Sequence, residues 1–168
     1  MAKLVLTDVQ VLVGPCYTGD NCLDITGTYN SPVYGPNSTP AYDISQWVSS
    51  VTLSTTYDIF ETTQVNDTAK KRVPGLADNQ VTLELQQDFG SGVTDLEYVM
   101  NQPGNSSLIG TIGRMLIRPR NQATSASNPQ YYFEVVFADW QPLSGSIGEL
   151  STIQVSWPVN GVINKSYT

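Results

Sequence analysis

Alternation of apolar and polar residues with a period of two is the feature that most constrains the fold of this chain. In residues 48–57 and 80–89, Val, Leu and aromatic residues take most of one set of alternate positions, while Thr, Ser, Gln and acidic residues take nearly all of the other set. Successive side chains of a β-strand point to opposite faces, so each segment predicts a strand with one face in a core and the other in water. The same reasoning predicts further strands at residues 3–13, 108–118, 130–140 and 151–158.

One short helix is predicted between the strands at 80–89 and 108–118. Thr94 followed three residues later by Glu97 has the form of a capping box, and a Pro-Gly pair soon ends the helical pattern. Several strands and a single short helix favour a mainly β fold, either a β-sandwich or a partly closed barrel. The 168 residues are expected to form one domain, spanning 1–168, that needs no cross-links.

Two long irregular segments interrupt the alternation. Residues 14–42 contain four Pro and four Gly, which predicts a long loop insertion at the surface of the domain. Residues 58–78 are expected to form a long connection between two strands, and they carry a basic triplet at 70–72 close to several acidic residues. A basic triplet this short is more often a solvated turn than a phosphate site.

The ionisable residues weigh against several classes of function. Eight Lys and Arg stand against fifteen Asp and Glu, and no basic cluster offers the surface that sequence-independent nucleic-acid binding requires. The chain has no His, the commonest general base and metal ligand, so we expect no catalytic, cofactor or metal site. Cys16 and Cys22 cannot complete a metal site alone. They could be two reduced thiols or form a small loop disulfide, and the sequence leaves both alternatives open. Residues 1–13 alternate and include Asp8, unlike a signal peptide or a membrane span.

Two groups of side chains leave room for other functions. Acidic residues on predicted strands could converge as a pair for glycoside hydrolysis, although acids spaced along a solvated sheet are far commoner. These residues are Glu84, Asp88, Glu134 and Asp139. Aromatic residues in and after the first irregular segment could stack on sugars, as in a monomeric carbohydrate-binding sandwich, or could pack the loop on its domain or on a neighbouring subunit. These residues are Tyr17, Tyr29, Tyr34, Tyr42 and Trp47.

Several phrases of the sequence follow one another in a recognisable order. A Ser/Thr-rich strand leads into Glu-Thr-Thr and Asp-Thr-Ala, and then into a Val-Thr-Leu-Glu strand that ends in Gln-Asp-Phe, all within residues 48–90. Residues 140–161 add a Gly-Ser-Ile-Gly-Glu-Leu turn and a closing strand with Trp-Pro, and the opening residues 3–11 fit as well. In this combination the chain resembles the major tail tube proteins of long non-contractile phage tails, the siphophage type, especially those of actinobacterial phages.

The resemblance implies a structural virion protein and not an enzyme. In the family, six subunits form a ring, rings stack into a tube, and the inner sheets close into a continuous β-barrel around the channel. The implied partners are other copies of the chain and the tail proteins at the tube ends, while genomic DNA passes without specific binding. No cofactor and no membrane are implied, and the protein would be assembled in the host cytoplasm and located in the virion tail. A tail terminator or a head–tail joining ring is an alternative, because such proteins can share the fold.

Two sets of residues are expected to serve this assembly. The outward positions of the strands at 48–57 and 80–89 should line the channel, because they are polar and their acids repel phosphates. These residues are Thr52, Ser54, Thr56, Thr82, Glu84, Gln86 and Asp88. Charged residues of the connection at 58–78 should contact another subunit and fix its register. These residues are Asp58, Glu61, Asp67, Lys70, Lys71 and Arg72. The insertion at 14–42 is longer than the family's connection, and we expect it on the tube exterior, where it does not obstruct the channel.

Overall fold

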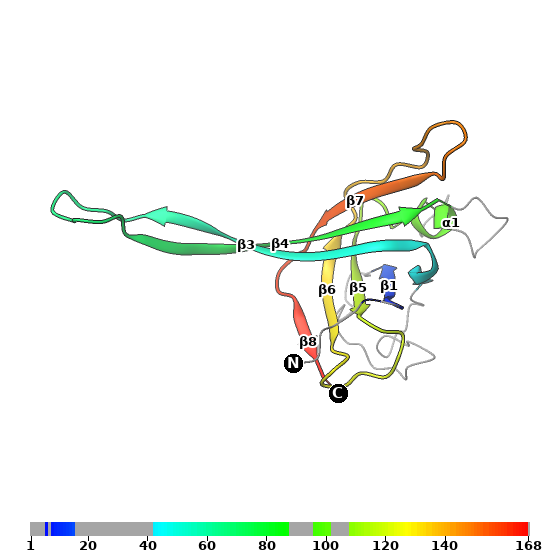
Figure 1. Ribbon diagram of the computed structural model, residues 1–168, viewed down its shortest axis with the longest axis horizontal. Helices are drawn as coiled ribbons and strands as arrows, with labels where there is room; N and C mark the ends of the chain where they lie inside the picture. Colours follow the sequence, from blue (N-terminus) through cyan, green and yellow to red (C-terminus); the bar gives the residue numbers. More distant parts are fainter. Residues whose placement is uncertain (1–5, 7, 16–41, 88–95, 102–107, 168) are drawn as a thin grey trace.

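The computed structural model describes residues 6, 8–15, 42–87, 96–101 and 108–167 (Figure 1). Most of the expected insertion at 14–42 lies outside these residues. Both cysteines, Asp88 and the Thr94 of the capping box lie outside them as well. The expectations for these residues therefore stay predictions.

The described strands form two antiparallel sheets. Five strands make the larger sheet, in the spatial order β2-β1-β5-β6-β8; they are β1 (Gln10–Pro15), β2 (Tyr42–Asp43), β5 (Ile112–Arg118), β6 (Gln130–Val136) and β8 (Asn164–Ser166). Three strands make the smaller sheet, in the order β3-β4-β7; they are β3 (Val48–Glu61), β4 (Arg72–Gln86) and β7 (Thr152–Pro158). A short 3-10 helix, η1 (Ser45–Trp47), precedes β3, and the helix α1 (Leu96–Asn101) follows β4. The predicted mainly β fold is confirmed in its sandwich form, because the two sheets do not close into a barrel.

The core lies between the two sheets and follows from the alternation in the sequence. Val81, Leu83 and Leu85 are fully buried on one face of β4, and they belong to the same hydrophobic cluster as the buried residues of β1, β5, β6, β7 and α1. Trp157 of β7 packs edge-to-face on Phe137, with ring centroids 4.9 Å apart. The alternation predicted for residues 80–89 thus matches the buried positions of β4.

The strands reach further than the sequence pattern indicates. β3 continues to Glu61 and β4 begins at Arg72, so strands occupy most of the expected connection at 58–78 and only residues 62–71 lie between them. The alternation stops near Tyr57 because the strands beyond it have no buried face, whereas backbone pairing requires none. The short edge strands β2 and β8 carry no sequence pattern that would have predicted them.

The hairpin of β3 and β4 projects well beyond the sandwich (Figure 1). We call the projecting part, residues 57–77, the arm. Strand pairing continues along it, with Phe60 opposite Val73, after a shift of register between Tyr57 and Ile59. The arm is therefore an extension of the smaller sheet and not an irregular loop.

Truncating Leu83 to Ala should destabilise the protein by about 2–5 kcal/mol, because the change removes buried atoms and leaves a cavity. Leu83 has no exposed surface and lies in the middle of the core face of β4. Gln80→Ala, on the exposed face of the same strand, is the matched control and should change the free energy of unfolding by less than about 0.5 kcal/mol. Urea denaturation of the purified chain measures both changes, and equal values for the two variants would contradict the assignment of the core.

Candidate assembly surfaces

The smaller sheet turns one face to the core and the other to water, and we call the second its polar face. Thr52 of β3 lies opposite Thr82 of β4, which in turn lies opposite Ser156 of β7. The hydroxyl oxygens of Thr82 and Ser156 are 3.0 Å apart. Alternate residues of a strand share a face, so the register defines the whole set. Its members are Ser50, Thr52, Ser54, Thr56, Asp78, Gln80, Thr82, Glu84, Gln86, Thr152, Gln154, Ser156 and Pro158.

The charge on the polar face is entirely negative. Glu84 is exposed between Ser50 of β3 and Gln154 of β7, and Asp78 lies opposite Thr56, closer to the arm. None of the described residues on this face is Lys or Arg. The surface therefore offers hydroxyl and amide groups and a few carboxylates, but no cation for a phosphate group.

The predicted channel residues that the structure describes all lie on this one face, and only Asp88 lies outside the described residues. Sequence reasoning predicts the strand at 151–158 but not its place in this face, which Thr152, Gln154 and Ser156 of β7 complete. The alternation of these residues with the buried apolar residues of β7 is the signal that could have found them. That the face lines a channel stays a prediction.

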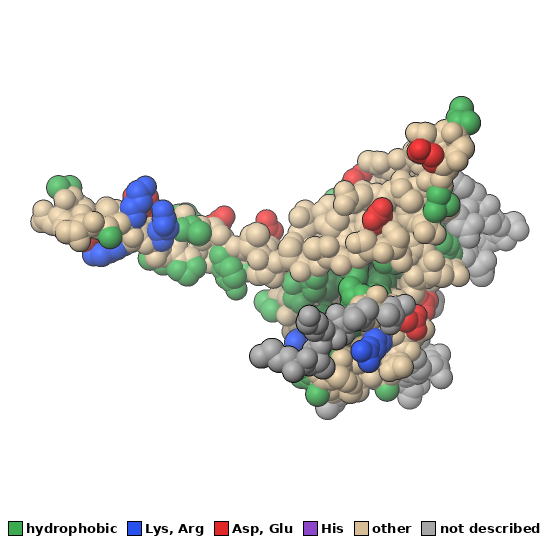
Figure 2. All heavy atoms as spheres, in the orientation of Figure 1, with side chains coloured by type: hydrophobic (Ala, Val, Ile, Leu, Met, Phe, Trp, Pro, Cys, Tyr) green, Lys and Arg blue, Asp and Glu red, His purple; other side chains and the backbone are tan. Residues whose placement is uncertain are grey.

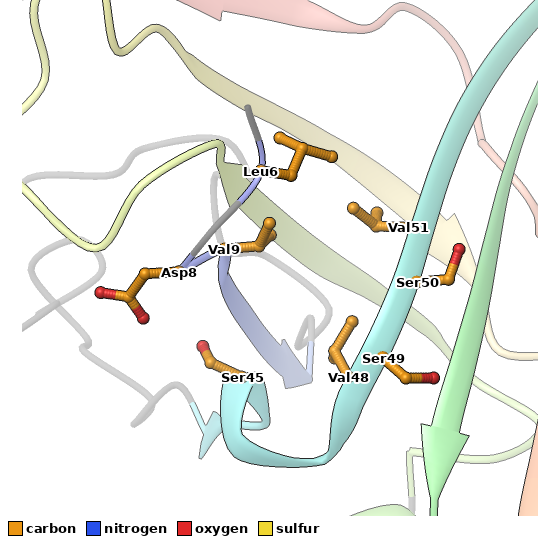
Figure 3. A pocket seen from close by; sticks show the side chains of 8 residues that line it. All are labelled: Leu6, Asp8, Val9, Ser45, Val48, Ser49, Ser50 and Val51. Atoms are coloured by element: carbon orange, nitrogen blue, oxygen red, sulfur yellow. The ribbon is translucent and has the colours of Figure 1, made fainter. Parts of the chain in front are cut away.

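The two edges of the smaller sheet, β3 and β7, differ in their surroundings. On the β7 side, an isolated bridge between Val135 and Val159 joins the two sheets. On the β3 side a groove of about 340 Å³ runs between β3 and the N-terminal residues. Leu6, Val9 and Val51 point toward one another across this groove (Figure 3). The bridge lies just beyond the end of β7 (Thr152–Pro158), so in the described residues both β3 and β7 remain edge strands of the smaller sheet.

The arm exposes large apolar side chains on both of its faces. Ile59 and Phe60 are 68% and 59% exposed, and as consecutive strand residues they point to opposite faces. The other members of this exposed group are Tyr57, Val65, Val73 and Leu76. Figure 2 shows apolar side chains gathered along the arm. Exposed apolar side chains gathered on one element are typical of interaction surfaces.

The charged residues expected to contact another subunit all lie on the arm, and four of them pair with one another. The Lys70 ammonium is 3.3 Å from a Glu61 carboxylate oxygen, and Lys71 forms an ion pair with Asp67. The other two members of the set have no ion pair within the described ranges; they are Asp58 and Arg72. Two of the three basic residues thus pair within the tip of their own hairpin, as in the solvated turn that the sequence also allows. Contact with another subunit stays a prediction.

The carboxylate of Asp67 is expected to titrate below its ordinary range. The backbone N–H of Gln64 donates to it at 2.8 Å and the Lys71 ammonium lies beside it, and both contacts lower its pKa. Because the pKa of Asp67 is lower in the folded than in the unfolded chain, its charged carboxylate stabilises the folded turn at pH values above the unfolded pKa. This contribution is lost as the pH falls through the folded pKa. In NMR titrations, Lys71→Ala should raise the pKa of Asp67 without restoring its ordinary value, because the Gln64 hydrogen bond remains. An unaltered pKa in this variant would show that the ion pair does not form.

The similarity of this chain to known proteins lies in its structure. No family model and no curated protein matches the sequence. A chain in the cryo-EM structure of the anti-feeding prophage (AFP) baseplate, six-fold symmetrised, is similar with a TM-score of 0.53 at 12% sequence identity. The match covers 99% of this chain and 97% of that chain. The two chains share a fold.

The described members of the other candidate sites do not come together in this fold. Glu84 lies on the polar face of the smaller sheet and Glu134 on the outward face of the larger sheet, so the core separates the two carboxylates. Trp47 is buried and Tyr42 packs against the core. These two rings therefore pack within the domain itself and are not free to stack on a sugar. Asp139 lies in the exposed segment after β6. The candidates outside the described residues are Tyr17, Tyr29, Tyr34 and Asp88.

Among the described residues that line the groove beside β3, Asp8 is the single ionisable one, so these residues offer no acid–base pair. Among the residues that the structure describes, no three His, Cys, Asp or Glu gather in a way that could hold a metal ion. In the same residues, no helix has the length and apolar character needed to cross a membrane. The surfaces that stand out are the polar face, the accessible edge at β3 and the arm.

Proposed function

We propose that this chain is a structural subunit of a phage tail, whose copies form stacked hexameric rings and build the tube through which genomic DNA passes. The observation that carries the proposal is the polar face, which spans three strands and bears carboxylates as its only described charges. Such a wall lets DNA slide without adhering, because it presents no cation to the phosphates. The fold shared with a chain of the anti-feeding prophage baseplate supports a role in a tail-like particle.

The two edge strands of the smaller sheet supply a way to close a ring. An exposed edge strand can pair with a strand of another chain. In a ring of six copies, β3 of one copy would lie beside β7 of the next, and the smaller sheets would join into a continuous barrel. The baseplate structure that contains the similar chain is six-fold symmetrised, which supports this number of copies. Such closure would also cover the groove beside β3.

The wall of the channel would be the polar face of every subunit. Six copies of Glu84 would form an acidic circle in each ring, and six copies of Asp78 would form a second. Fixed negative charge on a narrow wall repels the phosphates of a passing duplex and keeps it away from the surface. DNA would pass through the tube without specific binding and without a cofactor.

The arm would contact another copy of the chain, in the same ring or in the next one. Covering its exposed apolar side chains with a neighbouring copy would stabilise the contact by roughly 25 cal/mol per Å² of buried apolar surface. At the two ends of the tube the same surfaces would meet other tail proteins. The chain would therefore be located in the virion tail.

Negative-stain electron microscopy of the purified chain tests the proposal. Long tubes with a central channel are the expected result. Isolated rings would favour a tail terminator or a head–tail joining protein instead. Particles that stay monomeric at every concentration would contradict ring formation and favour a monomeric module, such as a carbohydrate-binding sandwich.

A further inference from the structure

The exposed large apolar side chains of the described residues are concentrated at two places. One place is the arm, and the other is the segment between β6 and β7, which we call the 141–150 loop. Its exposed members are Leu143, Ile147 and Leu150, and Ile147 is fully exposed. The arm leaves one end of the smaller sheet and the 141–150 loop stands at the other end (Figure 1).

A single side chain at the end of β4 holds the base of the 141–150 loop. The Gln87 amide nitrogen donates to the carbonyl of Gln141 at 3.0 Å, and its amide oxygen accepts from the backbone N–H of Ser144 at 3.2 Å and from the hydroxyl of Ser151. The backbone N–H of Gln87 also donates to the Ser151 carbonyl at 2.9 Å. A loop held in this way presents its apolar side chains at a reduced entropic cost of binding.

The charges available at the two places are complementary. The 141–150 loop contains Glu149 and no basic residue. On the arm, Lys70 and Lys71 are already paired within the hairpin, whereas Arg72 has no ion pair in the described part of the chain. Figure 2 shows the Lys and Arg side chains on the arm and an acidic side chain on the projecting loop. Asp58, the other unpaired charge of the arm, lies nearer its base.

We propose that the arm of one copy docks on the 141–150 loop of a copy in the neighbouring ring, with Arg72 facing Glu149. This inference rests on the proposed stacking of rings. Two different surfaces at opposite ends of a sheet make a heterologous contact, which repeats along an axis when the rotation between copies does not close a ring. Two kinds of contact are then separate: the sheet edges form each ring, and the arm and the loop join one ring to the next.

The critical concentration for tube formation, measured by sedimentation of the purified chain, tests this contact. Ile147→Ser should raise it by at least about tenfold, because the change removes a side chain that is buried only in the contact. Val162→Ser, an exposed apolar residue outside both places, is the matched control and should stay within about twofold. The residue changed in I147S lies outside the arm, so this comparison does not depend on how the arm folds.

A charge exchange tests the pairing of the two places. Glu149→Arg and Arg72→Glu should each raise the critical concentration several-fold, and the double variant should return it to within about threefold of the wild type. Rings, counted by mass photometry, should persist in all variants. Equal values for I147S and V162S, or a double variant no better than the single ones, would overturn the inference while tubes of the wild type still support the proposed function. A wild-type chain that forms neither rings nor tubes would overturn both.

Discussion

Virions that carry Glu84→Lys are expected to assemble normally and to release their DNA at least about tenfold more slowly at low salt. Glu84 is exposed on the polar face between Ser50 and Gln154, so the substitution meets no core atoms and should leave folding intact. In every ring it would replace six carboxylates with six ammonium groups. Each ammonium can bind a phosphate, and a duplex that moves through many rings would meet such groups along the whole tube.

The salt dependence of release separates this cause from a folding defect. Raising the ionic strength from about 0.01 M to 1 M shortens the Debye length from about 30 Å to 3 Å, so the E84K virions should recover most of their rate. Asp139→Lys makes the same change of charge at an exposed site off the polar face and should release DNA like the wild type. The double variant with Asp88→Lys should be slower still. Normal release by E84K at every salt concentration would contradict the assignment of the polar face to the channel.

Removal of the arm is expected to abolish tubes while leaving the sandwich folded. Asp58 and Gly75 lie side by side across the hairpin, so a two-residue Asn-Gly turn can replace residues 59–74 and join the shortened strands. The deleted residues are nearly all exposed and contribute nothing to the core cluster, so the free energy of unfolding should change little. Tubes should disappear even at high protein concentration, because the apolar surface proposed to join neighbouring copies is gone.

Two measurements decide the outcome for the armless variant. Urea denaturation should give a midpoint close to that of the wild type, which shows that the sandwich is intact. Electron microscopy should then show rings or single subunits and no tubes. Tubes of normal length from this variant would show that the arm is not an assembly element, and a strongly shifted midpoint would show that the arm supports the sandwich itself.

The core faces of β4 and β7 could be predicted from the sequence because these two strands have one buried and one solvated face. Leu83 and Val155 occupy core positions that alternate with the polar residues Thr82 and Ser156, and this alternation alone assigns each of them to a face. The grouping of Thr52, Thr82 and Glu84 on one face is confirmed for the same reason. A hairpin with both faces exposed has no alternation of apolar and polar residues. For this reason the sequence predicts an irregular connection where the structure has the arm.

The contacts of the candidate surfaces depend on register, which the sequence does not encode locally. Lys70 pairs with Glu61 only because the hairpin folds back at residues 62–71 and brings the two strands together. The polar face needs β7 beside β4, although 65 or more residues separate them in the chain, as the pairing of Gln86 with Thr152 shows. Such neighbours arise from topology, and a pattern read along one segment predicts the face of a residue but not its partner.

A cryo-EM reconstruction of tubes grown from the purified chain tests the central claim most directly. The account predicts six subunits per ring and a channel wall made of β3, β4 and β7, with the side chains of Thr52, Thr82 and Glu84 directed into the lumen. The core residues Val81 and Leu83 should point away from the channel, into the sandwich. A map in which the larger sheet lines the channel, or in which Glu84 lies on the outer surface of the tube, would contradict it.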